Sequence, residues 1–412
     1  MKILYPASYF FPENTAISHF DRDLLQALTD AGHEVEVVCP IPTRGITDDV
    51  WREYRCRKQE EMFGGKVRIQ RFWAPREGKN PVIRAFRYFW CVLESWHLGR
   101  RAKGIDVILA GSTPPIQGLA AGWLKKDLKC PFIYNLQDIF PDSLVNAGLA
   151  RRNSLLWKIG RWVENTTYRQ ADKIVVISRD FQSNLLAKGV PVDHLRLIYN
   201  WINEKEAYPV GREENPLFDR YHLPRNKFYV SYSGNIGHSQ NMDVLLDAAV
   251  SLLERKDIGF ILVGEGACRD HVKERIRSEG LDNVALLPYQ PYEEIASVFS
   301  LGDVSLLISK KGIGSNSVPS KTWGYMAAAR PVLASFDLNS ELCSLLQEEN
   351  CGVCVEPDSA EALSEMVVKL ASGECSLREM GERGRQYILD NLTTAAGTKR
   401  WLQLLEDMVE RS

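Results

Sequence analysis

A strand–helix–glycine–strand unit at the start of the chain constrains the fold most strongly. Lys2–Ala7 is a predicted strand, and Thr15–Ala31 has apolar residues at helical spacing. Gly32 suits the position just after a helix, and Glu34–Cys39 has the composition of a second strand. A strand, a crossover helix and another strand form a βαβ unit with parallel strands. We therefore predict an α/β fold.

The alternation of strands and helices then runs through two long regions. In the first, further strands are predicted at Val67–Phe72, Asp106–Ala110, Phe132–Asn135, Lys173–Ile177 and Leu195–Ile198. Residues 204–225 are polar, carry prolines and lack periodicity, which is typical of a linker. In the second region, strands are predicted at Phe228–Ser233, Gly259–Val263, Val284–Leu287, Val304–Ile308, Val332–Ala334 and Val353–Val355. We expect two α/β domains, 1–203 and 226–390, followed by a helical segment at 391–412.

Composition excludes several classes of protein. The 412 residues are 45% hydrophobic and 25% charged with a net charge of −2, which is ordinary for a globular protein and argues against a nucleic-acid binder. The nine cysteines are scattered through apolar runs, and the chain opens directly on a strand rather than a secretory signal. No apolar run is long enough to span a bilayer. We expect a reduced, cytoplasmic setting.

Small and polar residues follow the predicted strands, where ligands of open α/β sheets bind. In the second region these segments are Ser233–Gly237, Gly264–Gly266, Pro288–Gln290 and Ser309–Pro319. In the first region they are Tyr9–Ser18, Gly111–Thr113 and Leu136–Pro141. Two sets of this kind suit a ligand held between domains.

Gly312–Ser335 contains a polar glycine loop, a short helix pattern and an apolar strand. Such a loop offers N–H groups to an anion at a helix N-terminus. Lys321 falls in the first helical turn, where the dipole disfavours a cation unless a negative group is near. We hypothesise that the loop holds a diphosphate contacted by Lys321. The alternative is a helix start with a solvated lysine.

Asp138 is the candidate acid or base, because it follows an apolar strand at the expected domain mouth. It could bind a sugar hydroxyl or accept a proton, and the alternative is a helix-capping or turn aspartate. Asp21-Arg22-Asp23 resembles a metal motif but falls within a predicted helix, so a solvated helix face is expected. Cys351 and Cys354 are expected to be core thiols, and the histidines lack metal-ligand spacing. We expect no metal.

Lys66–Lys103 is a basic segment with interleaved aromatic residues, and it contains ten Lys or Arg and only two acidic residues. Its helical part suits the surface of an anionic membrane. RNA binding and an ordinary amphipathic helix are the alternatives. The residues expected to face the membrane are Arg84, Arg87, Trp90, Trp96, Arg100 and Arg101.

Several short segments together resemble one enzyme family. They are Phe11-Pro12-Glu13-Asn14, Gly32-His33-Glu34, Leu136–Asp142, Tyr232–Gly237, Val263–Gly266, Val318–Lys321, Tyr325–Ala328 and Pro331-Val332. On these residues the whole chain resembles family-4 retaining glycosyltransferases of the GT-B fold. The likeness is to bacterial enzymes of the O-antigen fucosamine-transferase and colanic-acid type.

The resemblance implies two Rossmann-like domains facing a central cleft, with the acceptor in 1–203 and a nucleotide-sugar in 226–390. It implies a final helix, Thr394–Val409, crossing back to the first domain, and neither cofactor nor metal. The implied donor-binding residues are Gly234, Asn235, Gly237, Glu265, Gln290, Ser315, Asn316, Ser317, Ser320 and Lys321. Asn14, Thr15 and Asp138 would line the acceptor side, and Asp138 and Lys321 would act in catalysis.

The chain departs from the family pattern at three places. Many members carry two glutamates where this chain has Asn316 and Gly324. A basic pair after the glycine loop is replaced by Asn235 and Gln240-Asn241. The usual glycines of the N-terminal loop are replaced by Asn14–Ile17.

The resemblance implies retaining transfer of a sugar, an N-acetylated hexosamine or deoxyhexosamine, from a UDP-type nucleotide diphosphate sugar. The implied acceptor is a lipid-linked saccharide of the polyprenyl pyrophosphate type in bacterial surface polysaccharide synthesis. The enzyme would sit at the inner face of the cell membrane and contact no nucleic acid. One alternative is a nucleotide-sugar 2-epimerase, which needs further carboxylates and histidines. The other is a non-catalytic nucleotide-sugar-binding protein at the membrane.

Overall fold

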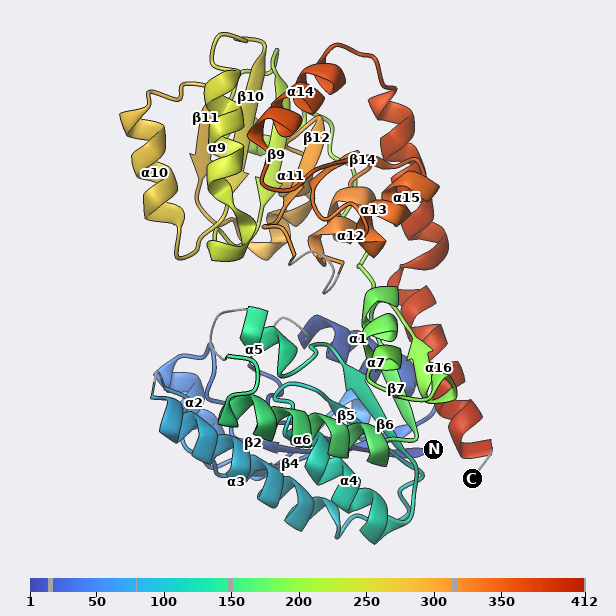
Figure 1. Cartoon of the computed structure of the whole chain (residues 1–412). Coiled ribbons are helices and arrows are strands. Elements are labelled where there is room, and N and C mark those ends of the chain that lie inside the picture. The colour runs from blue at the N-terminus through green and yellow to red at the C-terminus, as the bar shows by residue number, and fades with distance from the viewer. Residues whose placement is uncertain (14–17, 79, 147–150, 313–317, 411–412) are drawn as a thin grey trace. The chain divides into compact units, whose positions relative to one another are not determined.

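The computed structural model describes residues 1–13, 18–78, 80–146, 151–312 and 318–410. They divide into two compact units, each with one sheet (Figure 1). Unit 1 comprises Met1–Tyr199 and Gly397–Ser412, and unit 2 comprises Asn200–Ala396. The α/β prediction is confirmed.

Unit 1 has an eight-stranded sheet in the order β3-β4-β2-β1-β5-β6-β7-β8. All neighbouring strands are parallel except the edge pair β3 and β4. The order reverses between β1 and β5, which makes a topological switch point. The strands are β1 (Lys2–Pro6), β2 (Glu34–Pro40), β3 (Gln59–Met62), β4 (Val67–Phe72), β5 (Val107–Gly111), β6 (Phe132–Leu136), β7 (Lys173–Val176) and β8 (Leu195–Leu197).

Three helices of unit 1 cover one face of this sheet, namely α3, α4 and α6 (Figure 1). Gly118 and Gly122 of α4 let α6 approach closely, because a Cβ at either position would overlap Thr167 or Gln170. The helices of unit 1 are α1 (Ser18–Asp30), α2 (Asp48–Tyr54), α3 (Pro81–Gly99), α4 (Gln117–Leu128), α5 (Asp142–Asn146), α6 (Leu155–Gln170) and α7 (Arg179–Ala187). None of the helices in the described residues is long and apolar enough to cross a bilayer.

Unit 2 has a six-stranded parallel sheet in the order β11-β10-β9-β12-β13-β14. Its strands are β9 (Phe228–Ser233), β10 (Ile258–Val263), β11 (Val284–Leu287), β12 (Val304–Ile308), β13 (Val332–Ser335) and β14 (Gly352–Val355). Its helices are α8 (Pro216–Arg220), α9 (Met242–Ser251), α10 (Arg269–Ser278), α11 (Ile295–Phe299), α12 (Lys321–Ala327), α13 (Glu341–Glu348), α14 (Ala360–Ala371) and α15 (Leu377–Asn391). α16 (Thr394–Glu410) starts in unit 2, and its residues from Gly397 belong to unit 1.

The segment expected to be a linker, 204–225, is packed into unit 2. Leu217 and Phe218 of α8 are buried, and the Arg212 guanidinium pairs with Asp303 at 2.6 Å. Asn215 caps α8, because its side chain accepts a hydrogen bond from the Leu217 N–H, and Pro216 occupies the first helical turn. The proline that suggested a linker therefore starts a short helix.

The Asp21-Arg22-Asp23 prediction of a solvated helix face was wrong for Asp21. Its carboxylate accepts a hydrogen bond from the Tyr5 hydroxyl at 2.8 Å, which ties α1 to β1. Burial raises the pKa of Asp21 to about 7.

Candidate functional site

Two glycine loops meet at the carboxyl ends of β9 and β10. Gly234 follows β9, and Gly264 and Gly266 follow β10. A Cβ at Gly264 would lie 1.9 Å from the Gly234 carbonyl oxygen, and one at Gly266 would lie 2.3 Å from that of Ile236. Both positions also have positive φ values. Only glycine fits such a backbone-to-backbone contact.

Hydrogen bonds join these loops into one rigid surface. The Ile236 N–H donates to the Glu265 carbonyl at 2.8 Å, and the Cys268 N–H donates to the Ile236 carbonyl at 2.9 Å. The Gly234 N–H donates to Val263, and the Gly237 N–H donates to the Gln240 side chain. The N–H groups expected to bind phosphate at Gly234 and Gly237 are thus already bonded. These glycines contribute close approach of the backbone.

Lys321 is placed beside this surface at the start of α12. Its Nζ lies 4.0 Å from the centroid of the Tyr232 ring, and it would lie 3.1 Å from a Cβ at Gly234. No carboxylate of the described residues pairs with it. Burial lowers the pKa of Lys321 from 10.5 to about 7, while the Tyr232 ring offsets part of the cost of the charge. The site therefore holds a cation without a matching anion.

Tyr325 fixes α12 against β9. Its hydroxyl accepts a hydrogen bond from the Ser233 N–H at 2.9 Å and lies 3.2 Å from the Ser233 carbonyl oxygen. Lys321 and Tyr325 are four residues apart, so they share one face of the helix. The bond at Ser233 thereby positions Lys321 over Gly234, the next residue. α12 has only seven residues, so the lysine rather than the helix dipole supplies most of the positive charge.

Gly324 explains why a carboxylate is absent at this position. A Cβ there would lie 2.2 Å from the ring of Phe299 in α11. Phe299 is buried and stacks edge-on against Tyr325, with 5.4 Å between ring centroids. The ring fills the space that a side chain at position 324 would need.

We predict that Gly324→Ala destabilises unit 2 by about 1–3 kcal/mol through overpacking, which outweighs a helix-propensity gain of about 1 kcal/mol. Urea denaturation of the variant measures this. Phe299→Leu made together with Gly324→Ala should restore part of the loss, with a coupling of about 0.5–3 kcal/mol. Additive effects in the double variant would rule out the contact as the cause.

The other predicted donor residues have different surroundings. Glu265 is exposed and pairs with Arg269 at 3.2 Å. Gln290 is buried, and its amide bonds to Tyr221, Arg220 and the Pro288 carbonyl, so its polar atoms already have protein partners. The Ser320 side chain makes no capping hydrogen bond to α12. Asn235 lies between Gly234 and Ile236, and its carbonyl oxygen accepts from the Tyr232 hydroxyl. The predicted residues outside the described part of the chain are Asn14, Thr15, Ser315, Asn316 and Ser317.

Asp138 follows β6 in unit 1, at the carboxyl edge of its sheet. Loss of hydration raises its pKa, whereas hydrogen bonds from Ser143 and the Ile139 N–H lower it, and nearby Asp142 raises it. Bonds to the next residue and to the first turn of α5 match the turn-aspartate alternative. Asp138 remains exposed to solvent at the strand end, so burial removes only part of its hydration.

Sequence reasoning missed the role of Glu13, which is buried in the loop that follows β1. Its carboxylate accepts hydrogen bonds from the N–H groups of Phe10, Thr43 and Arg44, at 2.7–3.1 Å. Burial raises the pKa of Glu13, and these bonds counteract the shift. Glu13 therefore ties the loop after β1 to the segment after β2. The sequence analysis named Glu13 only as part of the Phe11–Asn14 segment that resembles the family, without a role for its side chain.

Arg87 was wrongly expected to face a membrane. Arg87 is buried. Its guanidinium lies over the Tyr9 ring and donates hydrogen bonds to the carbonyls of Ser8 and Pro75. On α3 it faces Ser8 and Tyr9 in the loop after β1 and Pro75 in the segment after β4, and these contacts replace water. Trp90 and Trp96 are half-buried and donate to the Trp73 carbonyl and to Asp127. Arg84, Arg100 and Arg101 are exposed as expected.

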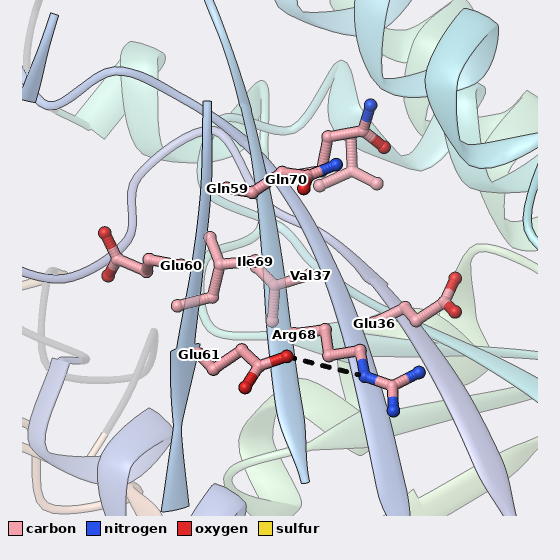
Figure 2. Close-up of a pocket in the computed structure, with 9 residues that line it drawn as sticks. Glu36, Val37, Gln59, Glu60, Glu61, Arg68, Ile69 and Gln70 are labelled. Carbon is pink, nitrogen blue, oxygen red and sulfur yellow. Dashed lines mark ion pairs between the residues drawn. The ribbon is translucent and has the colours of Figure 1, made fainter. Parts of the chain in front are cut away.

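A separate cavity of about 230 Å³ lies on the edge strands of unit 1 (Figure 2). Figure 2 shows Glu61 of β3 facing Arg68 of β4, which form an ion pair at 3.9 Å. Glu36 in the same cavity pairs with Lys2 at 2.6 Å. The charged side chains Glu36, Glu61 and Arg68 of this cavity therefore have ion-pair partners in the protein. Lys321, by contrast, has no carboxylate partner among the described residues.

Two family models match the chain in tandem. The model described as a glycosyl transferase 4-like domain matches residues 17–201, and the model described as glycosyl transferases group 1 matches residues 214–387. The chain belongs to the glycosyltransferases. The predicted family is thereby confirmed, and the loops of β9 and β10, with Lys321, lie within the group 1 region of this glycosyltransferase.

Curated relatives agree with this assignment. The probable glycosyltransferase WbjE of Pseudomonas aeruginosa is 27% identical over 83% of this chain and 85% of its own. The putative colanic acid biosynthesis glycosyl transferase WcaI of Escherichia coli K12 is 25% identical over 88% of this chain and 90% of its own.

Solved structures confirm the fold of the glycosyltransferase. Sucrose-phosphate synthase from Thermosynechococcus elongatus matches with a TM-score of 0.77 and 19% identity, covering 100% of both chains. Anabaena Alr3699/HepE in complex with UDP matches with a TM-score of 0.72 and 14% identity, covering 99% of this chain and 100% of that one. The two-domain GT-B prediction is thus confirmed as a fold.

Proposed function

We propose that the enzyme transfers a sugar from a UDP-linked sugar, an N-acetylated hexosamine or deoxyhexosamine, to a lipid-linked saccharide in bacterial surface polysaccharide synthesis. The observation that carries the proposal is the ammonium of Lys321 beside Gly234, with no carboxylate partner in the described residues. A diphosphate at the strand ends would neutralise that charge. Support for a UDP-type donor comes from HepE, which was solved with UDP and with UDP-glucose.

The proposed reaction retains the configuration at the anomeric carbon and uses no metal or other cofactor. The bond from the anomeric carbon to the β-phosphate oxygen breaks, and the acceptor oxygen bonds to that carbon on the same face. The acceptor proton passes to the departing phosphate. Lys321 would stabilise the charge that grows on that phosphate. Asp138 would contact the sugar or acceptor and help to orient it.

The acceptor side of the proposal rests on relatives and on α3. The relative WcaI is a putative colanic acid biosynthesis glycosyl transferase, and WaaG, a solved glycosyltransferase of the same fold, is involved in lipopolysaccharide biosynthesis. Helix α3 exposes Val82, Ile83, Phe86 and Phe89 in its first half, beside Arg84. An exposed apolar and basic helix face suits the inner surface of the cell membrane. The acceptor would be a polyprenyl pyrophosphate-linked saccharide.

The test incubates the full chain with a panel of UDP- and GDP-sugars and bacterial lipid extract. Free UDP together with labelled lipid, in the same anomeric configuration as the donor by NMR, is the expected result. Reactions without lipid measure donor hydrolysis. An epimerised sugar would instead identify an epimerase, and donor binding without turnover would identify a binding protein.

A further inference from the structure

Helix α6 carries an exposed apolar face that the sequence analysis did not single out. Leu155, Leu156, Ile159 and Trp162 are 75%, 50%, 52% and 57% exposed. Leu155, Ile159 and Trp162 are three or four residues apart and lie on one side of the helix. Leu156 lies at the edge of this side, where the stripe of Gly160 and Val163 reaches the exposed first turn. Gly160, Val163 and Thr167 lie on the buried side. The exposed face is therefore additional to the face that packs on unit 1.

Positive charge surrounds this face. Arg151, Arg152 and Lys158 are exposed, and no carboxylate of the described residues pairs with them. The single acidic residue of α6, Glu164, is buried and binds Lys188 at 2.8 Å as well as Arg161. The outer surface of α6 is thus apolar along its middle and basic at its edges.

The α6 face lies on the same layer as the exposed half of α3. Val92 of α3 and Val163 of α6 belong to one apolar cluster with Leu119 and Ala120 of α4. Figure 1 shows the three helices on one face of the sheet. α3 and α6 come after β4 and β6, parallel strands whose carboxyl ends lie at the same edge of the sheet, so both helices begin on the side of that edge.

We propose that the α6 face, Leu155, Leu156, Ile159 and Trp162, is a second membrane-contact surface that inserts into the interface of an anionic bilayer alongside α3. This deepens the proposed function, on whose membrane-borne acceptor it rests. Charge favours a bilayer over a second copy of the chain. A two-fold dimer through this face would bring the same cations together, whereas anionic lipid neutralises them. Two inserted helices would also fix the rotation of unit 1 on the membrane.

The experiment measures co-sedimentation of the full chain with vesicles of phosphatidylcholine containing phosphatidylglycerol, or of phosphatidylcholine alone. Leu156→Glu and Ile159→Glu should each weaken binding to anionic vesicles by about tenfold or more, because an apolar contact is lost and a like charge is added. The matched control is Leu186→Glu on α7, an exposed leucine outside the α6 face, which should bind as wild type does. Arg152→Gln should weaken binding by about fivefold.

Two outcomes would overturn the proposal. One is vesicle binding by Leu156→Glu equal to that of Leu186→Glu. The other is a wild-type chain that is dimeric in solution, together with a Leu156→Glu variant that is monomeric and binds vesicles as well as the wild type does. With a detergent-solubilised acceptor, Leu156→Glu, Ile159→Glu and Leu186→Glu should each release UDP at the wild-type rate. A wild-type chain that binds vesicles but turns over no donor would contradict the proposed function and leave the α6 face standing.

Discussion

Lys321→Met is expected to lower turnover by about a hundredfold to a thousandfold, the range seen when one group that stabilises developing charge is removed. The same variant should be more stable than wild type. Lys321 is a cation held in surroundings that lower its pKa to about 7, without a carboxylate partner in the part of the chain that the structure describes. Removing it deletes both the proposed catalytic charge and an electrostatic cost of folding.

The stability gain should depend on pH in a defined direction. Between pH 7 and 10.5 the unfolded chain keeps the Lys321 proton while the folded chain releases it, so wild-type stability rises with pH in this window. The cost of the charge is fully present below about pH 7 and absent above about pH 10.5. Thermal melts of Lys321→Met should therefore exceed wild type most at or below pH 7.

UDP binding provides the matching measurement. A bound diphosphate would raise the pKa of Lys321, so the wild-type Kd for UDP should increase as pH rises above about 7, by up to tenfold per pH unit. Titration calorimetry at several pH values tests this. Lys321→Met should bind weakly and lose this pH dependence. Lys369→Met, an exposed lysine at the end of α14, is the matched control. A UDP affinity unchanged in Lys321→Met would refute the diphosphate assignment.

Gly264→Ala is expected to destabilise unit 2 by about 3 kcal/mol or more and to abolish UDP binding. The new Cβ would lie 1.9 Å from the carbonyl oxygen of Gly234, and neither backbone can move without breaking the bonds between the loops. Backbone strain at a φ of +154° adds about 1–3 kcal/mol. The loop carrying Gly234 must shift, which displaces the surface next to Lys321.

Gly280→Ala separates the two causes. Gly280 also has a positive φ, of +64°, but a Cβ there meets nothing within 4 Å. It should cost about 1–2 kcal/mol from backbone conformation alone and leave UDP binding intact. Urea titration and calorimetry of both variants provide the comparison. If Gly264→Ala and Gly280→Ala lost the same stability and bound UDP with the same affinity, the contact between the two glycine loops would have no role.

The sequence predicted the parts of the fold that have strong local signals. Buried parallel strands such as β5 and β10 are runs of apolar residues and glycine, and Gly32 before β2 and Gly234 after β9 mark turns. It missed β3, because Gln59–Met62 is a short polar edge strand whose pairing depends on β4. It took 204–225 for a linker, because the packing of this segment depends on distant residues: the Asn215 side chain donates to the Ser297 carbonyl, 82 positions away.

The candidate site was predicted in outline and not in its contacts. The position of Lys321 at the start of a helix after β12 could be inferred from the chain. Two contacts depend on tertiary packing: the Phe299 ring occupies the space at Gly324, and the Glu13 carboxylate binds the distant N–H groups of Thr43 and Arg44. Arg87 falls on a basic amphipathic pattern, and only the packing of α3 shows that it turns inward.

The contact between Phe299 and Gly324 also sets the order in which this site could change over evolution. A descendant that acquired a glutamate at position 324 while keeping the ring would place a side chain where Phe299 already lies, with a Cβ 2.2 Å from that ring. A descendant that first replaced Phe299 by a smaller residue would lose packing yet remain folded, and could then accept the carboxylate. The route to a donor site with that glutamate therefore passes through α11 before it reaches α12.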